Sequence, residues 1–167
     1  MAKSMSPYLF PLLAVLMTHA GAVAVAADTA AKPAVSAEFP TRTQRLDTLF
    51  AELKKTSDAD KAKDIADRIR LEWQDSGSAS VNLLMQWAAK AAESNKQAVA
   101  LDLYDQAIAL APGYVEGWNQ RATLHYQMGN YRKSMSDINR VLILEPRHFG
   151  ALAGMAAILS ASGKDEL

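Results

Sequence analysis

The chain of 167 residues has no cysteine and no excess of charge of either sign, with 18 basic and 18 acidic residues. Without cysteine it can form no disulfide bond, no thiolate metal site and no cysteine nucleophile. The balanced charge gives no electrostatic reason to bind the phosphate backbone of a nucleic acid. Half of the residues are apolar and 22% are charged, a composition typical of a chain that buries a core. These absences favour a globular protein without disulfides.

Catalytic motifs are missing as well. The sequence has no Gly-x-Ser-x-Gly, no His-Glu-x-x-His and no glycine-rich phosphate loop. Beyond the N-terminal segment only His125 and His148 remain, 23 residues apart and without metal-site spacing. We expect His125 to pack in the core, and His148, which stands in a turn, to be solvated. We therefore predict no catalytic residue, no metal site and no cofactor.

Residues 1–27 have the layout of a secretory signal peptide. Lys3 gives a positive start, an apolar run covers 8–17, and the small residues 24–26 form a cleavage site. Residues 28–39 are rich in alanine and predict a flexible linker. An exported chain without cysteine suits the bacterial periplasm better than an environment where small domains rely on disulfides. The alternative is a chain tethered to the membrane by an uncleaved signal.

A period of 34 residues connects two segments, 81–114 and 115–148, and each segment has its proline near the end, at Pro112 and Pro146. Apolar or small residues coincide when the two segments are superimposed: Val81 with Val115, Ala88 with Ala122, Ala100 with Ser134, Tyr104 with Ile138, Ala107 with Val141, and Leu110 with Leu144. Spacings of three and four residues within each segment predict two amphipathic helices. The proline ends the second helix, because it removes a backbone donor. The period thus predicts two consecutive helical hairpins.

A further hairpin is predicted over 40–80, and a single helix follows the two repeats over 149–167. In the first of these segments Thr41 is a candidate N-cap for one helix, and Ser57 and Asp58 are candidates for the next. We interpret 40–80 as a degenerate N-terminal cap, since a stack of hairpins needs its terminal apolar face covered. The segment 149–167 opens a third repeat and contains one helix. Its last four residues, 164–167, spell an ER-retention signal, but they fall where the next helix would begin, and we interpret them as repeat sequence.

These segments resemble the tetratricopeptide repeat (TPR) family. The characteristic positions of that family are matched by Trp118, Ala122, Gly129, Ser134, Ile138 and Pro146. The resemblance is strong over 81–148, partial over 149–167 and weak over 46–80, and in the first full repeat Asn95 replaces the glycine that follows the first helix. It implies an all-α solenoid of antiparallel hairpins, with an incomplete last repeat, that binds another protein.

The resemblance also implies a concave groove lined by first helices. Its candidate residues are Asn82, Met85, Glu93, Glu116, Asn119, Thr123, Tyr126 and Gln127. Met85 and Ala89 stand where chaperone-binding members carry a lysine and an asparagine, so we expect no carboxylate clamp. An uncharged to mildly acidic groove suits an extended or helical peptide. Asn119 and Tyr126 are the strongest candidates, although either could simply pack between helices.

An apolar face on the last helix is the basis of a competing interpretation. Leu152, Met155, Ile158 and Leu159 are expected to be exposed there, because no second helix follows them in this chain. Such a face is expected in a truncated product or at a frayed end, or it is covered by another copy or a partner. The leading hypothesis is a non-catalytic adaptor in the bacterial cell envelope, and the first alternative is a homo-oligomer assembled through this helix. An enzyme subunit is the least favoured alternative.

Overall fold

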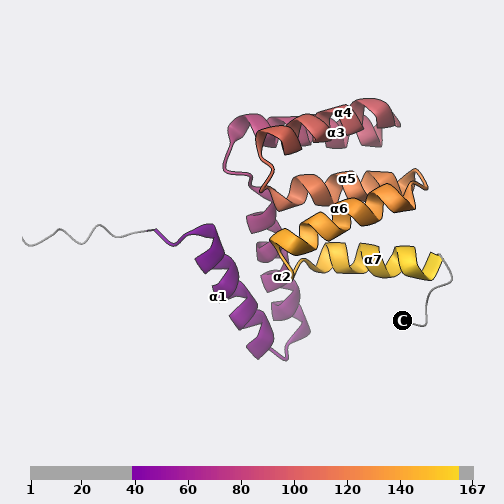
Figure 1. Cartoon of the computed structure of the whole chain (residues 1–167). Coiled ribbons are helices and arrows are strands. Elements are labelled where there is room, and N and C mark those ends of the chain that lie inside the picture. The colour runs from indigo at the N-terminus through magenta and orange to yellow at the C-terminus, as the bar shows by residue number, and fades with distance from the viewer. Residues whose placement is uncertain (1–38, 162–167) are drawn as a thin grey trace, which may run out of the picture. The chain divides into compact units, whose positions relative to one another are not determined.

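The computed structural model describes residues 39–161, which form helices and no strand (Figure 1). The predicted signal peptide, residues 28–38 of the predicted linker, and the segment 164–167 lie outside the described residues. The helices are α1 (Arg42–Lys55), α2 (Ala59–Gln74), α3 (Ala79–Glu93), α4 (Gln97–Leu110), α5 (Val115–Gln127), α6 (Tyr131–Leu144) and α7 (Phe149–Ala161). The predicted all-α repeat fold is confirmed.

Side-chain caps fix where the first helices begin. Thr41 forms a capping box with Gln44 at the start of α1, and the carboxylate of Asp58 accepts from two backbone N–H groups at the start of α2. Ser78 accepts from the N–H of Val81 at the start of α3. Each cap satisfies donors that have no partner inside the helix. Short polar residues thus separate α1, α2 and α3.

The two full repeats turn in the same way between their paired helices. Asn95 and Gly129, which are 34 residues apart, have φ angles of 58° and 73° and end α3 and α5. In both turns the next N–H donates back to the helix, from Lys96 to Ala91 at 2.9 Å and from Asn130 to His125 at 2.8 Å. Asparagine can replace glycine here because its side chain tolerates the left-handed region.

Small buried residues let the paired helices approach closely. Ala88 of α3 and Ala100 of α4 are fully buried together, and the equivalent pair, Ala122 of α5 and Ser134 of α6, is also buried. The Ser134 hydroxyl donates to the Ala122 carbonyl at 2.8 Å, so the one polar member of these pairs is satisfied. α5 then packs on α4, and α7 packs on α6, so the second helix of each repeat supports the first helix of the next.

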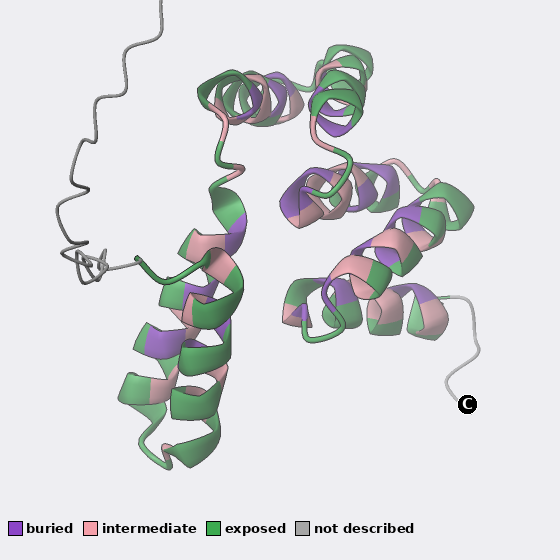
Figure 2. Ribbon diagram, turned by 60° about the vertical axis from the view of Figure 1, so that its left-hand side comes forward, coloured by how far each residue is buried: buried purple, intermediate pink, exposed green. Residues whose placement is uncertain are grey.

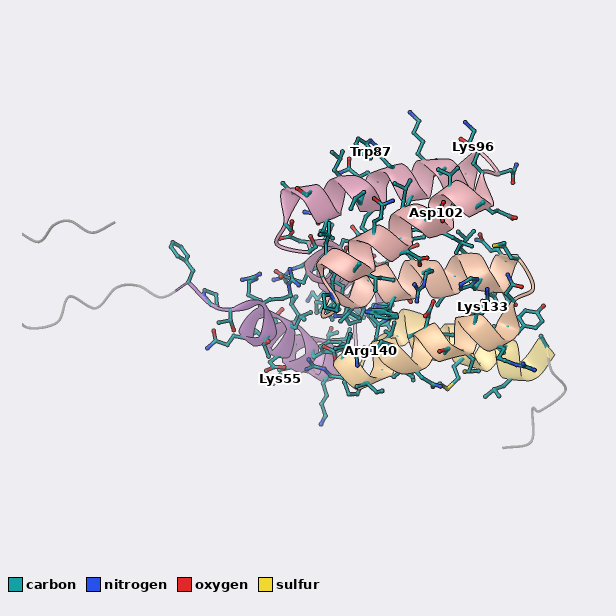
Figure 3. All side chains as sticks on the ribbon, turned by 45° about the horizontal axis from the view of Figure 1, so that its top comes forward. Lys55, Trp87, Lys96, Asp102, Lys133 and Arg140 are labelled. Atoms are coloured by element: carbon teal, nitrogen blue, oxygen red, sulfur yellow. The ribbon has the colours of Figure 1, made fainter. Side chains whose placement is uncertain are left out.

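The N-terminal hairpin α1–α2 forms, and outside the hairpin α2 packs on α5. Figure 1 shows α1 and α2 running steeply across the direction of α3 to α7, and α2 lies beside α5. Trp73 of α2 contacts Phe149 of α7, at 4.8 Å between ring centroids. Leu83 and Trp87 of α3 stay exposed, Trp87 at 53%, and Figure 3 shows Trp87 on the side of α3 away from α5. Beyond its own partner α1, α2 therefore packs on α5 and on Phe149 of α7.

The expectation that α7 exposes four apolar residues is corrected at Ile158. This side chain is only 4% exposed, because it packs with Ile138 and Val141 of α6. Met155 and Leu159 are partly buried, and Leu152 is 47% exposed. Figure 2 shows buried residues between neighbouring helices and exposed ones on their outer faces, α7 included. Packing on α6 thus buries part of the predicted apolar face, and of its four residues only Leu152 is exposed.

Candidate functional site

Three cavities follow one another along α5, on the face predicted to bind a partner. The α3–α5 cavity has a volume of about 490 Å³ and is also bounded by the end of α2. The central cavity, about 220 Å³, lies where α2, α5 and α7 meet. The α5–α7 cavity, about 110 Å³, lies between α5 and α7. Because α5 contributes to all three, it forms the spine of the candidate site.

Six of the eight predicted groove residues line these cavities. Asn82, Met85 and Glu116 line the α3–α5 cavity, and Glu116 and Asn119 also line the central one. The α5–α7 cavity is lined by Asn119, Thr123 and Tyr126. Glu93 and Gln127 are exposed and do not line any of these three cavities. The predicted positions thus come together around α5, but as separate hollows with different chemistry.

Glu116 is the buried acidic centre of the site. Its Oε1 atom accepts from Asn119 Nδ2 at 3.1 Å and from Gln120 Nε2, and its Oε2 lies 3.3 Å from His148 Nε2. The backbone N–H of Ala151 donates to Nδ1 of His148 at 3.1 Å, so this nitrogen is unprotonated and the Nε2–H donates to Glu116. Three donors therefore satisfy the buried carboxylate.

His148 is not solvated, contrary to the sequence-based expectation. It is 2% exposed, and its ring stacks on Trp73 at a centroid distance of 4.1 Å. Tyr114, which occupies the equivalent position one repeat earlier, donates its hydroxyl to the carbonyl of Gln74 at 2.6 Å. Two equivalent inter-repeat turns thus hold the end of α2. The only sequence feature that could have indicated these contacts is an aromatic ring at both positions, 114 and 148. The spacing alone does not show which residues the rings contact.

Tyr126 and Asn119 both have partners within the chain. The Tyr126 ring lies 5.5 Å from the Tyr131 ring between centroids, and the Asn119 side chain donates to Glu116. Thr123 donates its hydroxyl to the Asn119 carbonyl at 2.9 Å. Tyr126 is still 36% exposed at the edge of the α5–α7 cavity. It can contact a ligand with one part of its ring while the rest stays packed.

Hydrogen bonds keep Asp75 ionised, and burial keeps Tyr104 and Tyr114 neutral. Hydrogen bonds from Gly77 and Asn82 lower the pKa of Asp75. Burial raises the pKa of Tyr104 and Tyr114, and the Glu116 carboxylate adds to both effects. Both phenol groups therefore remain protonated and can donate or accept hydrogen bonds.

A separate polar hollow lies among α4, α5 and α6. Arg121 bridges Asp137, at 2.7 Å, and Asp105, and these side chains line the hollow together with His125. His125 is buried, as expected for a packing residue, and its burial lowers its pKa. In residues 39–161 no group of three or more histidine, aspartate and glutamate side chains is arranged to hold a metal ion.

The sequence was compared with those of known proteins, and it is closely similar to one relative. Over 124 residues the chain is 67% identical to a TPR repeat-containing protein of Rhizobium etli, covering 74% of this chain and 61% of that protein. Shorter stretches match Sperm-associated antigen 1 of Homo sapiens (45% over 42 residues, 25% of this chain and 4% of that protein) and Protein SGT1 homolog of Oryza sativa subsp. japonica (38% over 48 residues, 29% and 13%). No protein-family profile matches the chain.

The repeated helical pairs and this similarity together identify the chain as a tetratricopeptide repeat protein. It spans about three fifths of the length of the Rhizobium relative. Within residues 39–161 no helix has the combined length and apolarity needed to cross a bilayer.

Proposed function

We propose that the chain is a non-catalytic adaptor that binds a segment of a partner protein along α5, in the bacterial cell envelope. The observation that carries the proposal is the row of three cavities along one helix, with a buried acidic centre and a partly exposed aromatic ring. A row of hollows of different polarity suits an extended segment, whose successive side chains enter different hollows. The repeat fold supports the proposal because stacked hairpins present such a surface without any catalytic group.

The direct test is photo-crosslinking in living cells. A photoreactive residue replaces Asn119, and the same residue replaces Asp102, an exposed position on α4, as a matched control. We expect one dominant partner at position 119 and not at 102, and we expect Tyr126→Ala to reduce its capture. Equal capture at both positions, or no effect of Tyr126→Ala, contradicts binding along α5.

Export to the envelope rests on residues 1–27 and is tested separately. We expect the chain purified from its native host to lack this segment and to fractionate with periplasmic proteins. An intact N-terminus in the membrane fraction supports the tethered alternative, and an intact N-terminus in the cytosol contradicts export.

A homo-oligomer is the second candidate, and the exposed Leu152 on α7 favours it. Light scattering of the unsubstituted chain and of Leu152→Glu tests this candidate. If a multimer dissociates while capture at position 119 persists, the oligomer and the adaptor are separate properties of the chain. If the unsubstituted chain is already a monomer, the oligomer is excluded.

A further inference from the structure

The α3–α5 cavity has a shape and a lining that differ from the other hollows. The end of α2 forms one wall with Leu71, Gln74 and Asp75, while α3 and α5 form the others. The rings of Tyr104 and Tyr114 also line it. A volume of about 490 Å³ accommodates one long side chain together with part of its backbone. The cavity is therefore sized for a residue of a bound segment rather than for water alone.

The charged residues that line it are all acidic, although Arg42 and Arg45 act on Asp75 from outside the lining. Asp75 and Glu116 are acidic, and none of the residues that line the cavity is basic. Both hydrogen bonds to the Asp75 carboxylate, from Gly77 N at 2.9 Å and Asn82 Nδ2 at 3.1 Å, end on the same oxygen, Oδ1. Among residues 39–161, Oδ2 of Asp75 has no hydrogen-bond partner. One oxygen is thus held in place while the other is free to accept from a ligand.

Tyr104 supplies a second group without a partner. The side chain is only 3% exposed and lines the cavity, yet its hydroxyl makes no hydrogen bond to any residue in the described part of the chain. The Tyr114 hydroxyl, by contrast, is bonded to Gln74. Burial, followed by Glu116 and Glu93, raises the pKa of Tyr104, which keeps the phenol neutral. The hydroxyl is not one of the buried polar atoms that lack a partner, so it is accessible from the cavity and can bond to water or to a ligand.

We propose that the α3–α5 cavity binds a basic side chain, arginine or lysine, of the partner segment. Its aliphatic stem packs on Met85, Leu71 and Ala89, and its charged end reaches Asp75 and the Tyr104 hydroxyl. The two tyrosine rings add cation–π attraction. An acidic residue would face the two carboxylates of the lining, and a purely apolar one would cover the Tyr104 hydroxyl and the Asp75 carboxylate without replacing their contacts with water.

The neighbouring α5–α7 cavity shows that this preference is local. It is lined by no charged residue, and Ile138 lies there at the position equivalent to Tyr104. The basic residue of the partner is therefore selected at the α2 end of the site, and uncharged residues are accepted further along. The inference rests on the proposed function and specifies the chemistry of the segment that the adaptor binds.

The test is an NMR titration of the full chain with acetyl-Ala-Arg-Ala-amide. The matched probe is the citrulline peptide, which keeps the shape of arginine and removes its charge, and a glutamate peptide is the negative probe. With probes titrated to about 20 mM, since so small a ligand binds weakly, we expect saturable shifts of the Asn82, Ala89 and Gln120 amides with arginine. The citrulline peptide should bind at least about fivefold more weakly, and the glutamate peptide should cause no shifts there.

Two variants and a control assign the effect to the cavity. Tyr104→Phe removes only the unpartnered hydroxyl, and Asp75→Asn removes one charge; each should weaken the arginine peptide several-fold. Asp102→Asn makes the same charge change on α4, outside the cavity, and should have no effect. Equal binding of arginine and citrulline, shifts elsewhere only, or no shifts overturns the inference. Specific capture of a partner at position 119 can persist in each of these cases. The inference about the cavity can therefore fail while the proposed adaptor function stands.

Discussion

Replacing His148 by alanine is the sharpest test of how the N-terminal hairpin is held. The ring stacks on Trp73, its Nε2–H donates to Glu116, and its Nδ1 accepts the backbone N–H of Ala151. Among residues 39–161, His148 alone joins α2, the buried carboxylate and the start of α7 through a ring stack and two hydrogen bonds. Alanine removes all of them and leaves a cavity at a position that is 2% exposed.

The magnitude follows from these contacts. An aromatic pair contributes ~0.5–1.5 kcal/mol beyond its buried area, and a buried donor left without an acceptor, here the Ala151 N–H, costs ~1–3 kcal/mol. Glu116 keeps two of its three hydrogen-bond donors, so losing the bond from His148 costs less than leaving the Ala151 N–H without an acceptor. Since such terms overlap in one cluster, we expect His148→Ala to lower the free energy of unfolding by about 2–4 kcal/mol.

His148→Asn separates the helix-capping contribution from the rest. Asparagine can still accept the Ala151 N–H, as an N-cap residue does, but it can neither stack on Trp73 nor reach Glu116 in the same way. It should recover about 1 kcal/mol relative to alanine. Urea unfolding followed by tryptophan fluorescence and by circular dichroism measures both variants. A loss below about 1 kcal/mol for alanine would refute the reasoning, because the ring would then contribute little to a well-packed joint.

The remaining predictions concern charge, exposure and pH, and urea unfolding measures each. Arg121→Met should lower the free energy of unfolding by about 3 kcal/mol, because the buried carboxylate of Asp137 is left unpaired. Arg68→Ala removes an exposed ion pair and should lower it by less than about 1 kcal/mol. Similar losses for the two variants would contradict the difference in burial between the two ion pairs. Trp87→Gln should change stability by less than about 1 kcal/mol because the ring is 53% exposed, and a larger loss would show that the face is covered. Burial holds the pKa of His125 below 6.5, so the unfolded chain takes up this proton first and stability should fall as the pH drops through 6.5. His125→Gln should show a weaker fall, and an unchanged profile would contradict the buried neutral state.

The sequence was sufficient to predict the repeat fold because its signals are local. The 34-residue period, the prolines and the small residues at Ala88 and Ala122 act within one hairpin or between neighbours. The positive φ angle at Asn95 also follows from its place after a first helix. Such features need no knowledge of distant contacts, and the structure matches them closely.

The placement of α1–α2 could not be predicted, because it depends on contacts between residues far apart in sequence. Tyr114 and Gln74 are 40 residues apart, and no local pattern pairs them. The same cause explains the error at His148, which looks solvated in its turn until Trp73 covers it. In the candidate site, the residues of α3 and α5 follow from the repeat, but the third wall, from α2, does not.

The two equivalent turns that carry Tyr114 and His148 both contact the end of α2, and this changes how the chain should unfold. In an ordinary solenoid each repeat touches only its neighbours, so the ends can unravel independently and stability is close to a sum along the chain. Here the bond from Tyr114 to Gln74 connects the first hairpin to the start of α5, and the stack of His148 on Trp73 connects it to the start of α7. Hydrogen exchange should therefore show α1–α2 and α7 losing protection as one cooperative unit. Through these contacts the first hairpin and the later helices stabilise one another, although they are far apart in the sequence.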